Sequence, residues 1–389
     1  MKFGIIGSGC SGLFLSILLK KKFLDSEVFV IDKNKIVGRK LYVTGNGRCN
    51  LGNLNLDTFS YNEPFANNLV KKYGIKDEIN FLNSIGIKTR NLDNLVYPYS
   101  LSAKSFTDFL INYALKIGVN FINEEILLDY KLGSNILVKT NKNEYFCDKL
   151  FIACGGKSNP NLGSDGSIFD ILIKHNYDIE NCVPGLCPIK VFENTKSIEN
   201  ERLKCLVKLE KNSKIIHEEQ GEVLFKKDGL SGICIMNLAS IISRDKIKNC
   251  SIILDPFYDL EESFLNADLK DLFLKNGIHF LDGYFTKNIS NFIIKNSINK
   301  NQNTIELNDI NLISKYCKNI SFKYKENYSF NDSHVTVGGV LLNNIKDTFE
   351  SKIEKNVYIL GETLNLDGLC GGYNIMLCYS EAKQITDLI

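Results

Sequence analysis

The sequence contains no tryptophan, three methionines, six prolines and only five arginines among 47 basic residues, in a chain of 389 residues. No stretch approaches the roughly 18 consecutive apolar residues that a membrane span requires. The apolar N-terminal stretch is interrupted by glycines and ends in three lysines, which disfavours a signal peptide. We therefore expect a cytoplasmic protein that does not insert into a membrane.

The composition also excludes several classes of protein. Apolar residues make up 44% of the chain and charged residues 24%, values typical of a globular protein and not of a disordered or collagen-like chain. The net charge of +2 gives little overall field to attract nucleic acid, although a local basic patch would suffice. The amino-acid sequence does not indicate whether the chain forms oligomers.

The twelve cysteines form no CxxC motif and no Cys/His ladder with the spacing of metal ligands. We therefore expect no metal site and no disulfide framework. Most of the cysteines are predicted to be small buried residues of a protein in a reducing compartment. Cys49, the only cysteine inside a flavin motif, has no partner cysteine at CxxxxC spacing, so the sequence does not favour a disulfide-reductase mechanism.

The strongest chemical signal lies near the N-terminus. Lys2–Ile6 is predicted to be a buried strand, and the string GSGCSG and an apolar helix to about Lys22 follow it. In this pattern Gly7 permits a tight turn, Gly9 lets the backbone approach a pyrophosphate, and Gly12 lets the helix pack closely on the strand. The helix N-terminus would present N–H groups and partial positive charge to the phosphates.

A second predicted strand, Glu27–Ile31, ends at Asp32, which follows the last glycine of the motif by 20 residues. A carboxylate at this place can accept hydrogen bonds from both ribose hydroxyls of a dinucleotide, and it disfavours a 2′-phosphate. The combined pattern predicts a site for FAD or NAD rather than NADP.

The segment from Gly38 to Asn50 favours FAD over NAD. Its sequence, GRKLYVTGNGRCN, holds two of the five arginines of the chain, Arg39 and Arg48, together with three glycines. Such a loop can bind a second stretch of phosphate and polyol. FAD proteins of the glutathione-reductase type need a loop of this kind directly after the second strand, whereas NAD dehydrogenases do not.

Two later segments agree with FAD. Strands are predicted at Lys149–Ala153, before a Cys-Gly-Gly turn, and at Val357–Leu360, before Gly361-Glu362. Near the C-terminus, the string GGYN opens a predicted helix at Ile375–Ile385. The N-terminus of that helix could contact the pyrimidine edge of a flavin and stabilise negative charge there.

These motifs stand in the order GRKLYVTGNGRCN, LVYPYSLSA, CGGKSNPNLGSDG, GEVLFKKDGLSG, VTVGGV and YILGETLNLDGLCGGYN. The series resembles the YhiN/BaiN-type flavoproteins over nearly the whole chain. That family includes aminoacetone-oxidase-like oxidoreductases, bile-acid reductases and ribosomal RNA dihydrouridine synthases. The resemblance implies FAD held non-covalently by a Rossmann-like domain that an insertion interrupts. Asp32 stands where the family commonly has Glu, and Lys226-Lys227 stand where it often has Thr-His.

Motifs and resemblance together predict the cofactor-binding residues, but they assign no catalytic residue and no metal ligand. The predicted residues are Gly7, Gly9, Ser11, Gly12, Asp32, Lys33, Arg39, Lys40, Gly45, Gly47, Arg48, Cys49, Asn50, Cys154, Gly155, Gly361, Glu362, Gly372, Tyr373 and Asn374.

The predicted fold class is α/β, with a glutathione-reductase-type Rossmann FAD domain interrupted by a β-rich plus helical insertion. We expect the FAD domain at residues 1–187 and 334–389. The β-rich inserted domain is expected at 188–251 and a mainly helical subdomain at 252–333. Short strand patterns between Pro188 and Ser251 favour a small barrel or sheet.

The expected chemistry is that of a flavin, in which hydride enters at N5 and leaves to an electron-poor double bond or, in an oxidase, to oxygen. Because the chain holds one dinucleotide fingerprint, NAD(P)H would bind transiently as the reductant. The sequence does not decide whether the substrate is a small molecule or ribosomal RNA. In ribosomal RNA, the C5–C6 bond of a uridine would be reduced. A flavin-binding protein that acts by interaction is the third alternative.

The sequence does not assign a single role to Cys49 or to His334. Cys49 lies inside a flavin motif and could be a redox thiol, a general acid or a residue packed under the cofactor. His334 is the best placed of the four histidines, because it lies beside the return of the chain into the flavin domain.

Overall fold

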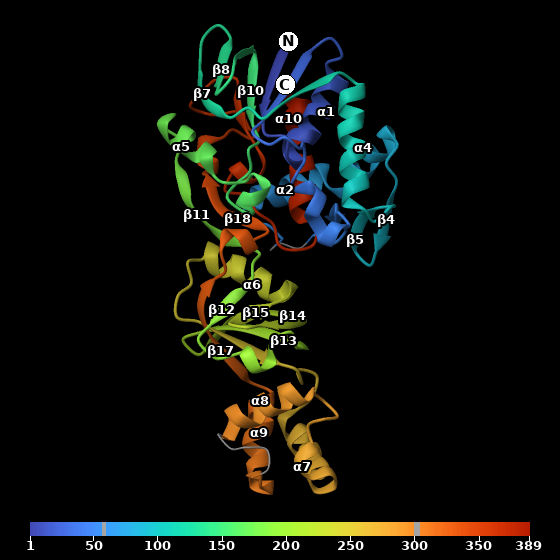
Figure 1. The fold of residues 1–389 in the computed structure, drawn as a ribbon, viewed down its shortest axis with the longest axis vertical. Helices are drawn as coiled ribbons and strands as arrows, with labels where there is room; N and C mark the ends of the chain where they lie inside the picture. Colours follow the sequence, from blue (N-terminus) through green and yellow to red (C-terminus); the bar gives the residue numbers. More distant parts are fainter. Residues whose placement is uncertain (57–59, 299–303) are drawn as a thin grey trace. The chain divides into compact units, whose positions relative to one another are not determined.

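The computed structural model describes residues 1–56, 60–298 and 304–389, and it divides into two compact units (Figure 1). The first unit contains residues 1–184 and 330–389, and the second contains residues 185–329. Each unit has its own hydrophobic core. The finer division of the insertion into a β-rich and a helical part stays a prediction.

A sheet of five parallel strands is the centre of the first unit. The strands run in the order β19-β10-β1-β2-β6, so the chain adds strands on one side of β1 and then returns to the other side. The order reverses between β1 and β10, which is where doubly wound folds bind their ligands. The strands are β1 (Lys2–Ile6), β2 (Glu27–Asp32), β6 (Val119–Asn123), β10 (Lys149–Ile152) and β19 (Val357–Ile359).

Helices α1 (Cys10–Lys22) and α10 (Tyr373–Leu388) pack against each other beside this sheet (Figure 1). Residues 11–19 of α1 are all buried, because the helix lies between the sheet and its neighbours. Lys22 donates a hydrogen bond of 2.6 Å to the carbonyl oxygen of Thr386, which joins the ends of the two helices. The unit also contains α2 (Pro64–Tyr73), α3 (Ile75–Ile85), α4 (Ala103–Lys116) and α5 (Ser167–Lys174).

Three smaller sheets complete the first unit. The antiparallel sheet β7-β8-β9 forms the connection between β6 and β10. The other two sheets have the orders β3-β5-β4 and β11-β18. Their strands are β3 (Gly52–Asn53), β4 (Thr89–Leu92), β5 (Leu95–Pro98), β7 (Leu127–Lys131), β8 (Ile136–Thr140), β9 (Glu144–Cys147), β11 (Ile179–Gly185) and β18 (Val335–Val340).

The second unit is built around a closed barrel with the strand order β12-β15-β14-β13-β16-β17. Its strands are β12 (Ile189–Val191), β13 (Arg202–Lys211), β14 (Lys214–Lys226), β15 (Gly229–Ser231), β16 (Ser251–Asp255) and β17 (Ile320–Asn327). Its helices are α6 (Ile233–Arg244), α7 (Glu262–Asn276), α8 (Lys287–Ile298) and α9 (Ile310–Cys317). The last two barrel strands come from the segment in which the sequence predicts mainly helix.

Strand β14 covers a stretch in which the sequence pattern predicts two short strands, Lys214–His217 and Glu222–Phe225, on either side of polar residues. The structure has one continuous strand, because the polar residues pair with β13 across the ladder. Glu218 stands opposite Lys208, and opposite charges at directly facing positions stabilise an antiparallel pair. Cross-strand pairing therefore overrides the low strand propensity of this stretch.

Among the helices that the structure describes, none is long and apolar enough to cross a membrane.

Candidate functional site

The glycine loop between β1 and α1 is shaped by two close approaches. A Cβ atom at Gly7 would lie 2.4 Å from the carbonyl oxygen of Ala153, and one at Gly12 would lie 2.0 Å from that of Gly7. Both distances are too short for any side chain, so these glycines allow the loop to pack on β10 and the helix to pack on the strand. These are the roles that the sequence predicts for a tight turn and for close helix packing.

Gly9 is different, because its Cβ position faces open space. Apart from Gly9 itself and its two chain neighbours, no atom of the described residues lies within 4 Å of a Cβ built at Gly9. Its backbone, with φ −69° and ψ −169°, is an extended conformation that any residue adopts. Packing within the protein therefore does not require a glycine here. A ligand that approached the N-terminus of α1 would require one, because a side chain would fill the space that the ligand needs.

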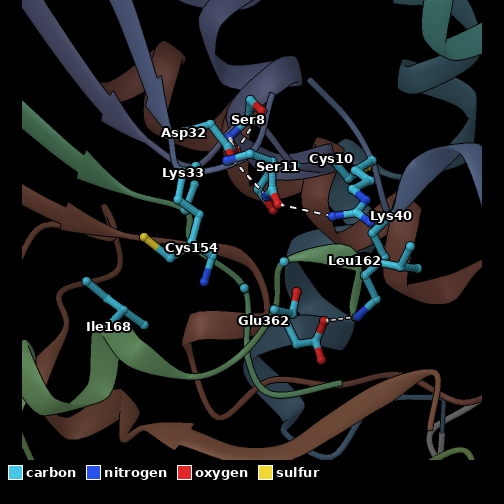
Figure 2. Close-up of a pocket in the computed structure, with 18 of the residues that line it drawn as sticks. Ser8, Cys10, Ser11, Asp32, Lys33, Lys40, Cys154, Leu162, Ile168 and Glu362 are labelled. Atoms are coloured by element: carbon cyan, nitrogen blue, oxygen red, sulfur yellow. Dashed lines mark hydrogen bonds and ion pairs between the residues drawn. The ribbon is translucent and has the colours of Figure 1, made fainter. Parts of the chain in front are cut away.

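The carboxylate of Asp32 closes the loop at the end of β2. One of its oxygens accepts hydrogen bonds of 2.7 Å from both the backbone N–H and the hydroxyl of Ser8. The other accepts bonds of 2.7 Å and 2.9 Å from the backbone and the side chain of Asn34. Figure 2 shows Ser8 and Asp32 facing each other in this way. The carboxylate is therefore held by donors from the loops that follow both β1 and β2.

A cavity opens in front of this loop, at the carboxyl ends of β1, β2 and β10 (Figure 2). Of the predicted residues it brings together Gly7, Gly9, Ser11, Asp32, Lys33, Arg39, Lys40, Cys154, Gly155, Glu362 and Asn374. These come from strand ends and loops far apart in the sequence. The cavity occupies the place at which an open α/β sheet binds its ligand.

Two ion pairs cross the cavity wall. Lys40 Nζ lies 2.9 Å from Glu362 Oε2, and Lys33 Nζ lies 2.5 Å from Asp165 Oδ1. The Lys40–Glu362 pair links the loop after β2 to the loop after β19, as Figure 2 shows. Glu362 also accepts a hydrogen bond of 2.6 Å from the backbone N–H of Thr336.

The second half of the glycine-rich segment does not line this cavity. Gly45, Gly47 and Arg48 are exposed, and a Cβ at Gly47 would meet no described atom within 4 Å. Leu41 and Thr44 of the same segment do line it. A cofactor contact for these three exposed residues stays a prediction.

Cys49 and Asn50 do not line the cavity. Cys49 is fully buried, and burial raises the pKa of its thiol to about 12. Asn50 Oδ1 is buried and has no hydrogen-bond partner among the described residues. A Cβ at Gly372 would lie 2.7 Å from this oxygen, so Gly372 gives room to the Asn50 amide. The motif residues GRCN and GGYN therefore meet in space.

The N-terminus of α10 forms another part of the site. The side chain of Asn374 accepts a hydrogen bond of 2.8 Å from the N–H of Gly368 and donates one of 2.9 Å to its carbonyl oxygen. Tyr373 is buried and donates to the carbonyl oxygen of Asn55 at 2.8 Å. The N–H of Gly361 donates to Glu381 at 2.5 Å. These contacts fix the turn that aims the first residues of α10 at the cavity.

The cavity also has walls that the cofactor-residue prediction missed. One of these walls is Leu162–Ile168. The other consists of Glu125–Leu127, His334 and Cys378. The string CGGKSNPNLGSDG contains a signal for the first wall, because Gly163, Asp165 and Gly166 of this string lie in that wall. No motif marks the second. His334 lines the cavity, and its pKa is lowered by desolvation and then by the charge of Lys40, which favours a neutral ring.

No group of three or more histidine, cysteine, aspartate or glutamate side chains in the described residues could hold a metal ion. Cys154 Sγ lies 3.5 Å from the carbonyl oxygen of Ile6, and burial raises the pKa of this thiol to about 12.

Comparison with known proteins gives matches along nearly the whole chain. A family model described as the HI0933-like protein Rossmann domain matches residues 1–386. The chain is 28% identical to the 3-dehydro-bile acid delta(4,6)-reductase of Clostridium scindens, over 97% of this chain and 96% of that protein. It is 27% identical to the ribosomal RNA dihydrouridine synthase of Escherichia coli, over 97% of this chain and 95% of that protein.

These matches confirm two predictions from the sequence, the family and the Rossmann-type α/β fold with a β-rich insertion. The relatives are named as a reductase and a dihydrouridine synthase, so the prediction of an oxidoreductase is confirmed at that level.

Proposed function

The chain belongs to the HI0933-like protein Rossmann domain family, and from this we propose that it is an FAD-dependent oxidoreductase that binds FAD non-covalently in the cavity. The observation that carries the proposal is the open space at Gly9, beside the carboxylate of Asp32 and the N-terminus of α1. Packing within the protein requires a glycine at Gly7 and at Gly12 but not at Gly9. The loop therefore has room for a ligand at Gly9.

The residues present fit a dinucleotide. The pyrophosphate would lie against Gly9 and the N-terminal N–H groups of α1, where the helix dipole favours negative charge. Asp32 would accept the hydroxyls of the adenosine ribose, adding to or replacing the donors that it now has. The N-terminus of α10 would favour negative charge in the same way at the other end of the cofactor.

When bound, FAD would accept hydride from NAD(P)H and deliver it to an electron-poor double bond. The chain's own contribution is to bind and orient both partners. NAD(P)H would be the transient reductant, because the sequence holds a single dinucleotide fingerprint. A protein that binds FAD but is not reduced by NADH or NADPH would support the non-catalytic alternative instead.

The proposal is tested by identifying the cofactor that the purified protein carries. The purified protein is expected to be yellow and to release FAD, not FMN, on denaturation, with chromatography of the released flavin as the measurement. Anaerobic addition of NADH or NADPH is then expected to bleach the flavin absorbance. A colourless protein that added FAD cannot reconstitute would overturn the proposal.

Ribosomal RNA is the second candidate substrate, and a surface of the second unit favours it. Lys190 Nζ and Lys226 Nζ lie 5.7 Å and 5.0 Å from the centre of the Tyr328 ring. Lys323 Nζ lies 5.5 Å from the ring centre of Phe192, which is 63% exposed. Lysines beside accessible aromatic rings suit a single-stranded nucleic acid, through phosphate contacts and base stacking.

Mapping dihydrouridine in ribosomal RNA, with and without this protein, separates the two substrate classes. Loss of one dihydrouridine position in cells that lack the protein, and its return with the wild-type chain, would support RNA. An unchanged map would leave reduction of a small molecule as the proposed reaction.

A further inference from the structure

Two cysteines from different helices meet in the wall of the cavity. Cys10 is the first residue of α1, and Cys378 lies in the second turn of α10. Both side chains line the cavity and are only partly buried. The two thiols are close enough that each changes the pKa of the other, and both cysteines are free. The packing of α1 on α10 brings these thiols together.

The surroundings make the two thiols unequal. The neighbouring Cys10 thiol lowers the pKa of Cys378, and the hydroxyl of Ser11 and the charge of Lys40 lower it further, while burial and the charge of Glu362 oppose them. The same contact with Cys378, and then burial, raises the pKa of Cys10. Cys378 is therefore the thiol that ionises first, and the thiolate is the nucleophilic form.

We propose that Cys10 and Cys378 form a redox-active dithiol, a modification site for peroxides in the wall of the cavity. The Cys378 thiolate attacks one oxygen of hydrogen peroxide, so an S–O bond forms, the O–O bond breaks and, after protonation, one water leaves. Cys10 then attacks the sulfenic sulfur, the S–O bond breaks, an S–S bond forms and a second water leaves. The two thiols lose two electrons in total, and the peroxide is reduced to two waters.

FAD and peroxide would compete for this site, a part of the inference that rests on the function proposed above. Both thiols line the cavity that we assign to the cofactor. An occupied cavity would therefore shield the dithiol, and an empty one would expose it. Oxidation would be confined to protein that has released its cofactor.

The experiment is peptide mapping under non-reducing conditions after treatment of the FAD-depleted full chain with hydrogen peroxide. The expected product is a single peptide pair joined through Cys10 and Cys378, which separates again on addition of a thiol reductant. The wild-type chain answers the question directly, so the result does not depend on the folding of a variant. Peroxide treatment that oxidises other thiols but gives no such pair would overturn the proposal.

Cysteine variants add a matched comparison. Cys10→Ser and Cys378→Ser are each expected to abolish the cross-linked pair. Cys154→Ser is the control, because Cys154 lines the same cavity but directs its sulfur to the carbonyl oxygen of Ile6. The cross-link is expected to form in that variant as in the wild type. Its disappearance there would contradict the assignment of the pair.

Reconstitution with FAD separates the two proposals. At a free FAD concentration of roughly ten times Kd, the empty fraction falls to about one eleventh, so cross-linking should slow about tenfold. Slowing on this scale supports both the dithiol and its place at the cofactor site. A cross-link that forms equally fast in flavin-loaded protein would overturn the shielding by FAD, while the dithiol itself would stand.

Discussion

Nδ1 of His175 lies 2.8 Å from Oε1 of Glu354, in a network that joins three distant segments of the first unit. Nε2 of the same ring lies 2.9 Å from Asp129 Oδ1, and the ring of Tyr130 stacks on it with centres 3.9 Å apart. The hydroxyls of Tyr130 and Tyr177 donate to the other oxygen of Glu354. An imidazolium ring thus has a carboxylate at each nitrogen.

This arrangement predicts a stability that falls as pH rises. Burial alone would lower the pKa of His175, but the hydrogen bonds and charges of Asp129 and Glu354 outweigh it and raise the pKa. A raised pKa gives stabilisation that is complete below the unfolded value, about 6.5, and is lost as pH rises through the folded value. Chemical denaturation of the wild type and His175→Asn across this range measures the effect.

His175→Asn is expected to lower the free energy of unfolding by about 1–3 kcal/mol at pH 6, since it removes the charged partner of the buried Glu354 carboxylate, to which only the hydroxyls of Tyr130 and Tyr177 would still donate. The difference should shrink at higher pH. His279→Asn is the control, because His279 contacts Asp282 at 2.9 Å on the surface and exposed pairs contribute little. A gap between wild type and His175→Asn that does not change with pH would contradict the role of the charged ring.

Gly9→Val is expected to abolish FAD binding and to leave the fold intact. The valine side chain would occupy the open space at the loop, and the extended backbone there accepts it without strain. The free energy of unfolding of the apoprotein should change by less than about 0.5 kcal/mol. Flavin titration and thermal unfolding of the apoprotein are the measurements.

Gly12→Val gives the contrast, because its Cβ would lie 2.0 Å from a backbone oxygen. This variant should lose about 3 kcal/mol or more of stability along with cofactor binding. If Gly9→Val bound FAD as the wild type does, the cofactor site would be elsewhere.

Asp32→Ala is expected to weaken FAD binding by about 1–3 kcal/mol, the cost of losing a charged hydrogen-bond partner. The variant also removes the acceptor that holds the loop at Ser8. Asp165→Ala is a matched control, since Asp165 is a carboxylate of the same cavity that pairs with Lys33. Equal weakening by both variants in a flavin titration would indicate a general charge effect and not a ribose contact.

The glycine loop and Asp32 were predictable because their geometry is local. A strand, a tight turn and a helix follow one another within a few residues, so the spacing alone places Gly7, Gly9 and Gly12. The carboxylate falls at the end of the next strand in the sheet for the same reason. Short-range backbone constraints, which a sequence expresses directly, determine this part of the site.

The remaining walls depend on packing between distant segments. Cys10 and Cys378 are 368 residues apart, and they meet only because α10 packs on α1. In the loop after β2, Gly45 and Asn46 both have positive φ, 57° and 52°, and the chain leaves the helical turn there. No periodic pattern encodes either feature, so neither could be read from the sequence.

Cys49 is expected to be unreactive in the folded protein. Its side chain is fully buried, and burial raises the pKa of the thiol to about 12, so the nucleophilic thiolate is scarce. Iodoacetamide should modify it only after unfolding, whereas the half-buried thiol of Cys370 should react sooner. Peptide mass analysis over time measures both. Equally fast modification of Cys49 in the native state would revive its role as a redox thiol or general acid.

The hairpin turn after β14 places two lysines next to the aromatic surface of the second unit. Lys226 is half-buried with its ammonium over Tyr328, whose hydroxyl donates to Asp228, and Lys227 is exposed in the turn. A turn with two positive charges is suited to phosphate, but it is also an ordinary solvated turn. Salt dependence of binding distinguishes these cases, because each phosphate contact releases counterions.

Replacing Lys226 and Lys227 together by Gln is expected to weaken RNA binding. It should also lower the log–log salt slope by about one unit for each phosphate that a lysine no longer neutralises. The flavin spectrum and its reduction by NAD(P)H should stay unchanged, since neither lysine lies in the cavity lining. The control is the double variant of Lys71 and Lys72, which makes the same charge change on α2 of the first unit. If the salt slopes of wild type and variant coincide, the hairpin does not contact phosphate. If the wild type itself binds no RNA at low salt, the RNA proposal fails and a small substrate for the flavin is favoured.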